Sequence, residues 1–166
     1  MKVEEVMTRE AEVCTPETKL AEAAHLMWEG DCGVLPVIED GGHVVGLITD
    51  RDICMASAMN FEPVTEIPVS RIISGEVYAC RAEADIRDAL KLMQQHRVRR
   101  LPVVNDEGVL QGILTMNDVA LEAKEGKNSK TGITYGDVLT TIKAICAHRN
   151  LPQVETQPPR QKAATV

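Results

Sequence analysis

The chain has 166 residues, 44% of them hydrophobic and 26% charged, a composition typical of one ordinary globular domain or of two very small ones. Its formal net charge of −7 argues against broad electrostatic binding to nucleic acid, which needs a basic face. Because no apolar run approaches the roughly 18 residues that span a bilayer and the N-terminus lacks signal-peptide features, we expect a cytoplasmic protein with no membrane association.

The first part of the chain predicts a strand, a helix, a β-hairpin and a second helix. Hydrophobic residues recur at helical spacing before a glycine, and two apolar runs flank the turn residues Asp40–Gly42. In chain order, the expected elements are a strand near Val13, a helix capped by Thr18 and ending near Gly30, strands over 34–38 and 44–48, and a helix over 50–59.

The same order of elements returns at an offset of 66 residues. Residues 14–53 align with 80–119 without a gap, and 13 of the 40 aligned pairs are identical, which indicates a duplication. After a linker over 60–68 and a short helix over 69–73, the expected elements of the second copy are a strand near 79, a helix over 85–96, strands over 99–104 and 109–115, and a helix from about 117.

A copy of this size buries too little surface to be stable alone. We therefore expect an α/β (α+β) fold in which two βαββα repeats, over 1–59 and 69–123, pack by pseudo-two-fold symmetry into one module.

The remaining residues predict a loop over 124–133, a helix over 134–149 and a disordered Pro-, Gln- and Thr-rich tail over 150–166. Thr134 and Asp137 have the spacing of a capping box. We expect a single apolar face of this helix to be buried, against its own module or against a second subunit or partner. The residues of that face are Val138, Leu139, Ile142, Ile145 and Cys146.

Each copy carries a Thr-x-x-Asp pair at the start of its second helix. Thr49 and Asp52, like Thr115 and Asp118, project a hydroxyl and a carboxylate to the same side of the chain. A carboxylate there can accept the hydroxyls of a ribose, and the free N–H groups of the first helical turn favour a phosphate. The alternative is that both pairs merely cap their helices.

The segments Gly46–Asp52 and Gly112–Asp118, the strands Leu35–Val37 and Leu101–Val103 and the opening Val6–Thr8 resemble the signature of CBS domains, a family named for cystathionine β-synthase. The resemblance covers about residues 1–122. It implies a two-repeat regulatory module with two adenosyl-ligand sites in the cleft between the repeats. It also implies a homodimer formed through the helices, with Trp28 as a candidate contact.

In the family, each site takes its Thr and Asp from one repeat and its adenine walls from the other. Carried over by position, the first site consists of Thr49, Arg51, Asp52, Ile73, Val98, Arg99 and Arg100. The second site consists of Met7, Cys32, Gly33, Thr115, Asn117 and Asp118. Arginine suits phosphate because its planar fork donates two parallel hydrogen bonds, so we expect the first site to bind a phosphorylated ligand more tightly. The alternative is that Arg97, Arg99 and Arg100 form a solvated edge or pair with nearby acids.

The sequence thus predicts a regulatory module that binds AMP, ADP or ATP, with NAD and S-adenosylmethionine as further candidates, and that acts on an unidentified partner protein. The alternative is a ligand-independent dimerisation or scaffold protein. The five cysteines form no CxxC pair, the histidines lack metal-ligand spacing, and the sequence contains no P-loop or nucleophile motif. We therefore expect neither a metal nor an enzyme activity.

Overall fold

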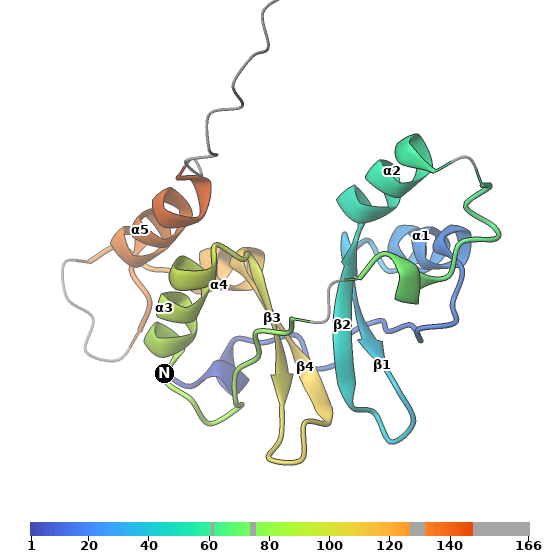
Figure 1. The fold of residues 1–166 in the computed structure, drawn as a ribbon. Helices are drawn as coiled ribbons and strands as arrows, with labels where there is room; N and C mark the ends of the chain where they lie inside the picture. Colours follow the sequence, from blue (N-terminus) through green and yellow to red (C-terminus); the bar gives the residue numbers. More distant parts are fainter. Residues whose placement is uncertain (61, 74–75, 127–131, 148–166) are drawn as a thin grey trace, which may run out of the picture.

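The computed structural model describes residues 1–60, 62–73, 76–126 and 132–147, and its two halves repeat one order of elements (Figure 1). The first half contains α1 (Leu20–Glu29), β1 (Val34–Ile38), β2 (Val44–Thr49) and α2 (Asp50–Met59). The second half contains α3 (Ile86–His96), β3 (Arg100–Val104), β4 (Leu110–Thr115) and α4 (Met116–Glu122). Short 3-10 helices, η1 (Val3–Glu5) and η2 (Val69–Arg71), precede the halves, and α5 (Tyr135–Cys146) follows them. The expected α/β fold with two βαββα repeats is confirmed.

The predicted strand near Val13 consists of one parallel bridge, between Cys14 and Val37, and its counterpart joins Cys80 to Val103. β1 and β2 form an antiparallel hairpin, as do β3 and β4, and both hairpins have an irregularity after the residue pair that contains a glycine. Most residues of β1 and β3 are buried because they contribute to the core of their own repeat. Each repeat therefore has its own small sheet, with both helices on its outer side (Figure 1).

The two hairpins meet side by side at the centre of the molecule (Figure 1). His43 and Val109, which are 66 positions apart, form an isolated antiparallel bridge. Two hydrogen bonds flank it: Val44 N–H donates to Gly108 O (3.2 Å), and Leu110 N–H donates to Gly42 O (3.0 Å). Each of these contacts maps onto the other under the 66-residue offset, so the pseudo-two-fold axis passes through this bridge.

The segment before each repeat packs into the core of the other repeat. Val3 N–H donates to Ala84 O (3.0 Å), and Val69 N–H donates to Thr18 O (2.8 Å). Both valine side chains are fully buried, Val3 in the core of the second half and Val69 in the core of the first. The exchange ties the halves together through apolar contacts on both sides of the axis.

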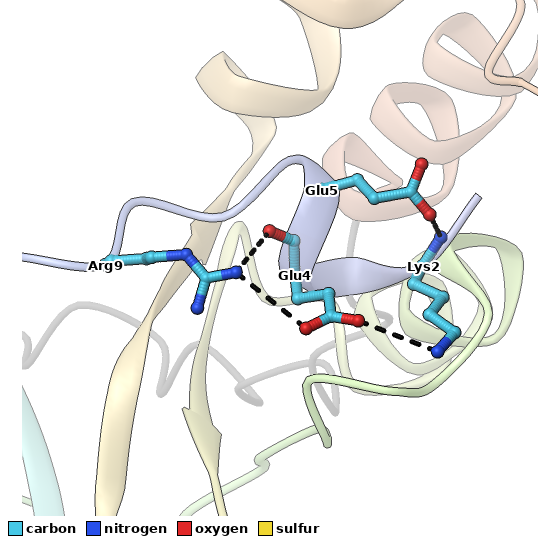
Figure 2. A network of polar contacts seen from close by, with 4 residues as sticks. All are labelled: Lys2, Glu4, Glu5 and Arg9. Atoms are coloured by element: carbon cyan, nitrogen blue, oxygen red, sulfur yellow. Dashed lines mark hydrogen bonds and ion pairs between the residues drawn. The ribbon is translucent and has the colours of Figure 1, made fainter.

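Charged side chains of the N-terminal segment form a network of polar contacts (Figure 2). Lys2 N–H donates to Glu5 Oε1 (2.7 Å), and Arg9 Nη2 donates to Glu4 O (3.2 Å). The Glu4 carboxylate also lies between Lys2 Nζ (3.6 Å) and Arg9 Nη2 (3.8 Å). The Glu4 carboxylate thus forms ion pairs with both Lys2 and Arg9.

The prediction that Thr18 caps α1 is wrong. The helix begins at Leu20 after Lys19, and no side chain caps its N-terminus. Thr18 Oγ1 instead accepts a hydrogen bond from Thr15 N–H (3.0 Å), because Thr18 belongs to the turn that pairs with η2. Asp85, one residue before α3, does cap its helix by accepting from Arg87 N–H (2.8 Å).

The expected capping box of α5 is confirmed, and only part of the expected apolar face is buried against its own module. α5 packs on α3 and α4 of its own chain, with Val138 and Ile145 against the core of the second half. Thr141, which is 0% exposed, turns toward α3 and accepts a hydrogen bond from Gln94 Nε2 (2.8 Å). Leu139 and Ile142, by contrast, are 59% and 41% exposed. Cys146 is exposed as well.

The predicted tail over 150–166 lies outside the described residues. Among the residues that are described, no helix combines the length and the apolar character needed to cross a bilayer.

Candidate functional site

Both Thr-x-x-Asp pairs form complete capping boxes. In the first, Thr49 N–H and Thr49 Oγ1 donate to Asp52 Oδ2 (2.9 and 2.6 Å), and Asp52 N–H donates to Thr49 Oγ1 (3.2 Å). Thr115 and Asp118 repeat these contacts at 2.8, 2.6 and 3.2 Å. Both pairs therefore cap their helices, α2 and α4. The cap fixes each threonine at the junction of a strand and a helix.

The two aspartates differ in their second carboxylate oxygen. Asp118 Oδ1 accepts a hydrogen bond from Thr8 Oγ1 (3.2 Å), a residue of the N-terminal segment. The position equivalent to Thr8 in the repeat is Ser74, which lies outside the described residues. Within the described part of the chain, Asp52 Oδ1 has no hydrogen-bond partner.

A cavity of about 600 Å³ lies between the first helix-capping pair and the start of β3. It contains five residues of the expected first site: Thr49, Arg51, Val98, Arg99 and Arg100. The first two come from the β2–α2 junction and the other three from the second repeat. The cleft therefore takes its walls from both repeats, as the sequence led us to expect.

The other two residues of the expected first site do not line this cavity. Asp52 lies one helical turn inside α2, with one carboxylate oxygen committed to the helix cap. Ile73 packs against Gly46, where an added Cβ would lie 2.7 Å from Ile73 Cδ1. Gly46 thus permits the close approach of an isoleucine side chain, which joins the core of the first half.

Positive charge dominates the first cavity. Four arginines line it, Arg51, Arg97, Arg99 and Arg100, together with the acids Asp50 and Glu76. Among the described residues none of these arginines forms an ion pair or a side-chain hydrogen bond. Pairing with neighbouring acids is therefore not seen among the described residues. The alternative that these arginines are solvated fits the exposure of Arg51, Arg97 and Arg99.

A second cavity, of about 440 Å³, lies over the second helix-capping pair. It contains five residues of the expected second site: Cys32, Gly33, Thr115, Asn117 and Asp118. Met7, the sixth, is only 8% exposed and belongs to the core of the second half. Arg99 and Arg100 line this cavity too, so the two arginines that we assigned to the first site form a wall shared by both.

Seven residues that line the first cavity were not part of the expected site. Four of them are Val34, Leu47, Asp50 and Ile145, and the other three are Glu76, Tyr78 and Arg97. The ring of Tyr78 stacks on His96 with centroids 3.7 Å apart. A hydrogen bond with the Glu76 carboxylate, together with burial, raises the pKa of Tyr78. Arg97 ends α3 in a left-handed conformation (φ 54°).

The internal repeat contained the signal for all three. At the 66-residue offset, Glu76, Tyr78 and Arg97 correspond to residues 10, 12 and 31, and those three line the second cavity. Either cavity could thus have been deduced from the other.

Two cysteines with raised pKa values, Cys14 and Cys80, lie outside the cavities. Burial raises the pKa of Cys14 and of Cys80 from 9.0 to about 11, so both thiols stay protonated at neutral pH. Within the described residues, no group of three or more His, Cys, Asp or Glu side chains is arranged to hold a metal ion.

Two βαββα units that exchange their leading segments and enclose two equivalent cavities define a duplicated module with an inter-repeat cleft. The chain belongs to the CBS domain family, whose model matches residues 3–58 and 69–125. The match covers both repeats and the two segments that they exchange.

Relatives with this architecture cover nearly the whole described fold. The CBS domain-containing protein YhcV of Bacillus subtilis is 33% identical over 149 residues, which cover 90% of this chain and 97% of that protein. Hypoxic response protein 1 of Mycobacterium tuberculosis is 32% identical over 129 residues, covering 77% of this chain and 82% of that protein. The crystal structure of CBSX2 in complex with AMP is 28% identical, covers 72% of this chain and 93% of that chain, and superposes with a TM-score of 0.62.

Proposed function

We propose that the protein is a regulatory module that binds an adenine nucleotide in the cavity over Thr49. The observation that carries this proposal is a cavity of about 600 Å³ that contains a helix N-terminus and four arginines, none of which has an ion-pair partner among the described residues. Arginine forks and free N–H groups of a first helical turn are both complements of phosphate. A volume within roughly 300–1,000 Å³ is that of a typical small-molecule site.

Within the adenosyl class, AMP is the first candidate. The solved relative CBSX2 contains AMP, and its structure covers most of this fold. In the arrangement that we propose, Val98 contacts the base, Thr49 faces the ribose, and Arg51 and Arg99 bind the phosphate. ADP, ATP, NAD and S-adenosylmethionine are further candidates because they share the adenosyl group.

A thermal-shift screen of these five compounds tests the proposal. A ligand at 100 times its dissociation constant adds about 2.7 kcal/mol to the stability of the folded state. Calorimetric titration of Arg99→Ala with AMP should then show a loss of about tenfold or more, because a charge-assisted hydrogen bond is lost. Arg81→Ala is the matched control, since Arg81 is exposed and pairs with Asp106 (3.1 Å) outside the cavities. Equal affinities in both variants would remove Arg99 from the site.

The regulated target in this proposal is a separate protein, and the module itself is non-catalytic and forms a homodimer through its helices. Exposed large apolar side chains on α1 and α2 support the dimer: Trp28 is 85% exposed, Met55 48% and Met59 71%. Light scattering at several concentrations should give twice the chain mass for the wild type and a single chain mass for Trp28→Glu. A monomeric wild type would contradict the dimer.

These same exposed side chains favour a second candidate, a dimerisation or scaffold protein that keeps the fold without a ligand. In that case the Thr-x-x-Asp pairs serve only as helix caps. The absence of a thermal shift with all five compounds, combined with a stable dimer, is the result that would support it.

A further inference from the structure

The two cavities are equivalent positions of one duplicated unit, yet their charged residues have diverged. Under the 66-residue offset, Arg51 corresponds to Asn117, and the left-handed Arg97 (φ 54°) corresponds to the left-handed Asp31 (φ 46°). Both residues of each pair line their respective cavities. A positive charge at two positions of the first cavity is thus neutral or negative at the same positions of the second.

A third pair of equivalent residues changes in the same direction. Tyr78 of the first cavity is replaced by Glu12 in the second. The charged residues of the second cavity are Glu10, Glu12, Asp31, Asp118, Arg99 and Arg100. The acids outnumber the bases there, whereas the bases outnumber the acids in the first cavity.

The two arginines of the second cavity are the ones that it shares with the first. Arg100 stands at the boundary between the cavities: a Cβ added to Gly33 would lie 3.3 Å from Arg100 Nη2 and 3.1 Å from Asp50 Oδ2. Gly33 lines the second cavity, and Asp50 lines the first. Among the described residues, the second cavity therefore has no cationic side chain of its own.

A phosphate bound in the first cavity would engage these shared donors. The second cavity would then present its acids without compensation, and a second phosphate there would face like charges on both sides. A ligand with no charge or with a positive charge would meet no such penalty.

We propose that the second cavity is a separate site for an adenosyl compound that lacks a phosphate group, and that Arg99 and Arg100 restrict each module to one phosphorylated ligand at a time. This inference rests on the proposed function, since it requires that the first cavity binds an adenine nucleotide. We expected two sites for the same class of ligand with unequal affinities. We now propose that the two sites bind different classes of ligand.

Calorimetric titration of the full chain tests the inference with two probes of opposite charge, AMP and S-adenosylmethionine. AMP should bind with a stoichiometry of one per chain, and a second AMP should bind at least about tenfold more weakly. S-adenosylmethionine, added to protein saturated with AMP, should bind with a further stoichiometry of one without displacing AMP.

The double variant Glu12→Gln/Asp31→Asn removes two of the acids and keeps the left-handed backbone, which asparagine tolerates. It should bind a second AMP more tightly than the wild type, by about tenfold, and S-adenosylmethionine more weakly. Glu39→Gln/Glu107→Gln is the matched control, because both glutamates are exposed on the hairpins outside the cavities.

Two AMP molecules of equal affinity per wild-type chain would overturn the inference and leave the proposed function intact. Competition between the two probes for one site would have the same effect. A wild-type chain that binds no AMP would overturn the proposed function and, with it, this inference.

Discussion

Replacing Thr49 by alanine separates the two roles of the capping box. The substitution removes the hydroxyl that accepts from Asp52 N–H (3.2 Å) and donates to Asp52 Oδ2 (2.6 Å). Loss of an N-cap side chain costs about 1 kcal/mol, within a range of roughly 0.5–2 kcal/mol. For a chain of this size, that cost lowers the melting temperature by about 2–4 °C.

The chain contains its own control for this experiment. Thr134 caps α5 with the same box, in which Thr134 Oγ1 donates to Asp137 Oδ2 (2.8 Å) and Asp137 N–H donates to Thr134 Oγ1 (3.2 Å). Thr134→Ala should therefore lose a similar free energy of unfolding. Its box lines neither of the two cavities between the repeats.

Urea unfolding followed by circular dichroism measures the stability of both variants, and calorimetry measures their affinity for AMP. We expect Thr49→Ala to bind AMP about tenfold more weakly or worse, since a hydrogen bond to a charged or polar ligand group is lost. Thr134→Ala should bind AMP as the wild type does, and Thr49→Ser should retain both properties. If Thr49→Ala loses stability but keeps wild-type affinity, Thr49 is only a helix cap.

Two further predictions concern the core. Gly112→Ala would place a Cβ 2.5 Å from the carbonyl oxygen of Thr8, so it should lower the free energy of unfolding by about 1–3 kcal/mol in a urea titration. Gly126→Ala is the control: an added Cβ there has no atom within 4 Å, so the free energy of unfolding should hardly change. Cys14 and Cys80 should react with iodoacetamide at pH 8 only after the exposed cysteines, because their pKa values are about 11. Mass spectrometry that finds early labelling of either thiol would contradict their burial. Since the thiols of the unfolded chain titrate near 9.0, the free energy of unfolding should fall between pH 9 and pH 11.

The sequence was a good guide to the fold because the repeat marks the same points twice. Both hairpins begin within a residue of their predicted start, and α2 has the predicted bounds. What the pattern could not show is the exchange of Val3 and Val69 between the cores. That exchange depends on how the halves are oriented, which local periodicity does not encode. Which part of the apolar face of α5 packs on its own module could not be predicted for a related reason, since it depends on how α5 sits on α3, where Gln94 Nε2 donates to Thr141 Oγ1.

The candidate site was predictable where a motif existed. Thr49, Arg51 and Arg99 line the first cavity as expected, because the signature fixes the end of the strand and the start of the helix. Glu76 and Tyr78 belong to no motif and lie before a strand that consists of one bridge. The structure places both residues in the wall of the first cavity, and their equivalents at positions 10 and 12 line the second.

A crystal structure of the chain with AMP tests the central claim most directly. The account predicts electron density for AMP in the cavity lined by Thr49 and Val98, with its phosphate within hydrogen-bond distance of Arg51 or Arg99. It also predicts that AMP occupies this cavity in preference to the one lined by Asp118. An empty first cavity in crystals soaked at millimolar AMP, or AMP bound only in the second cavity, would contradict it.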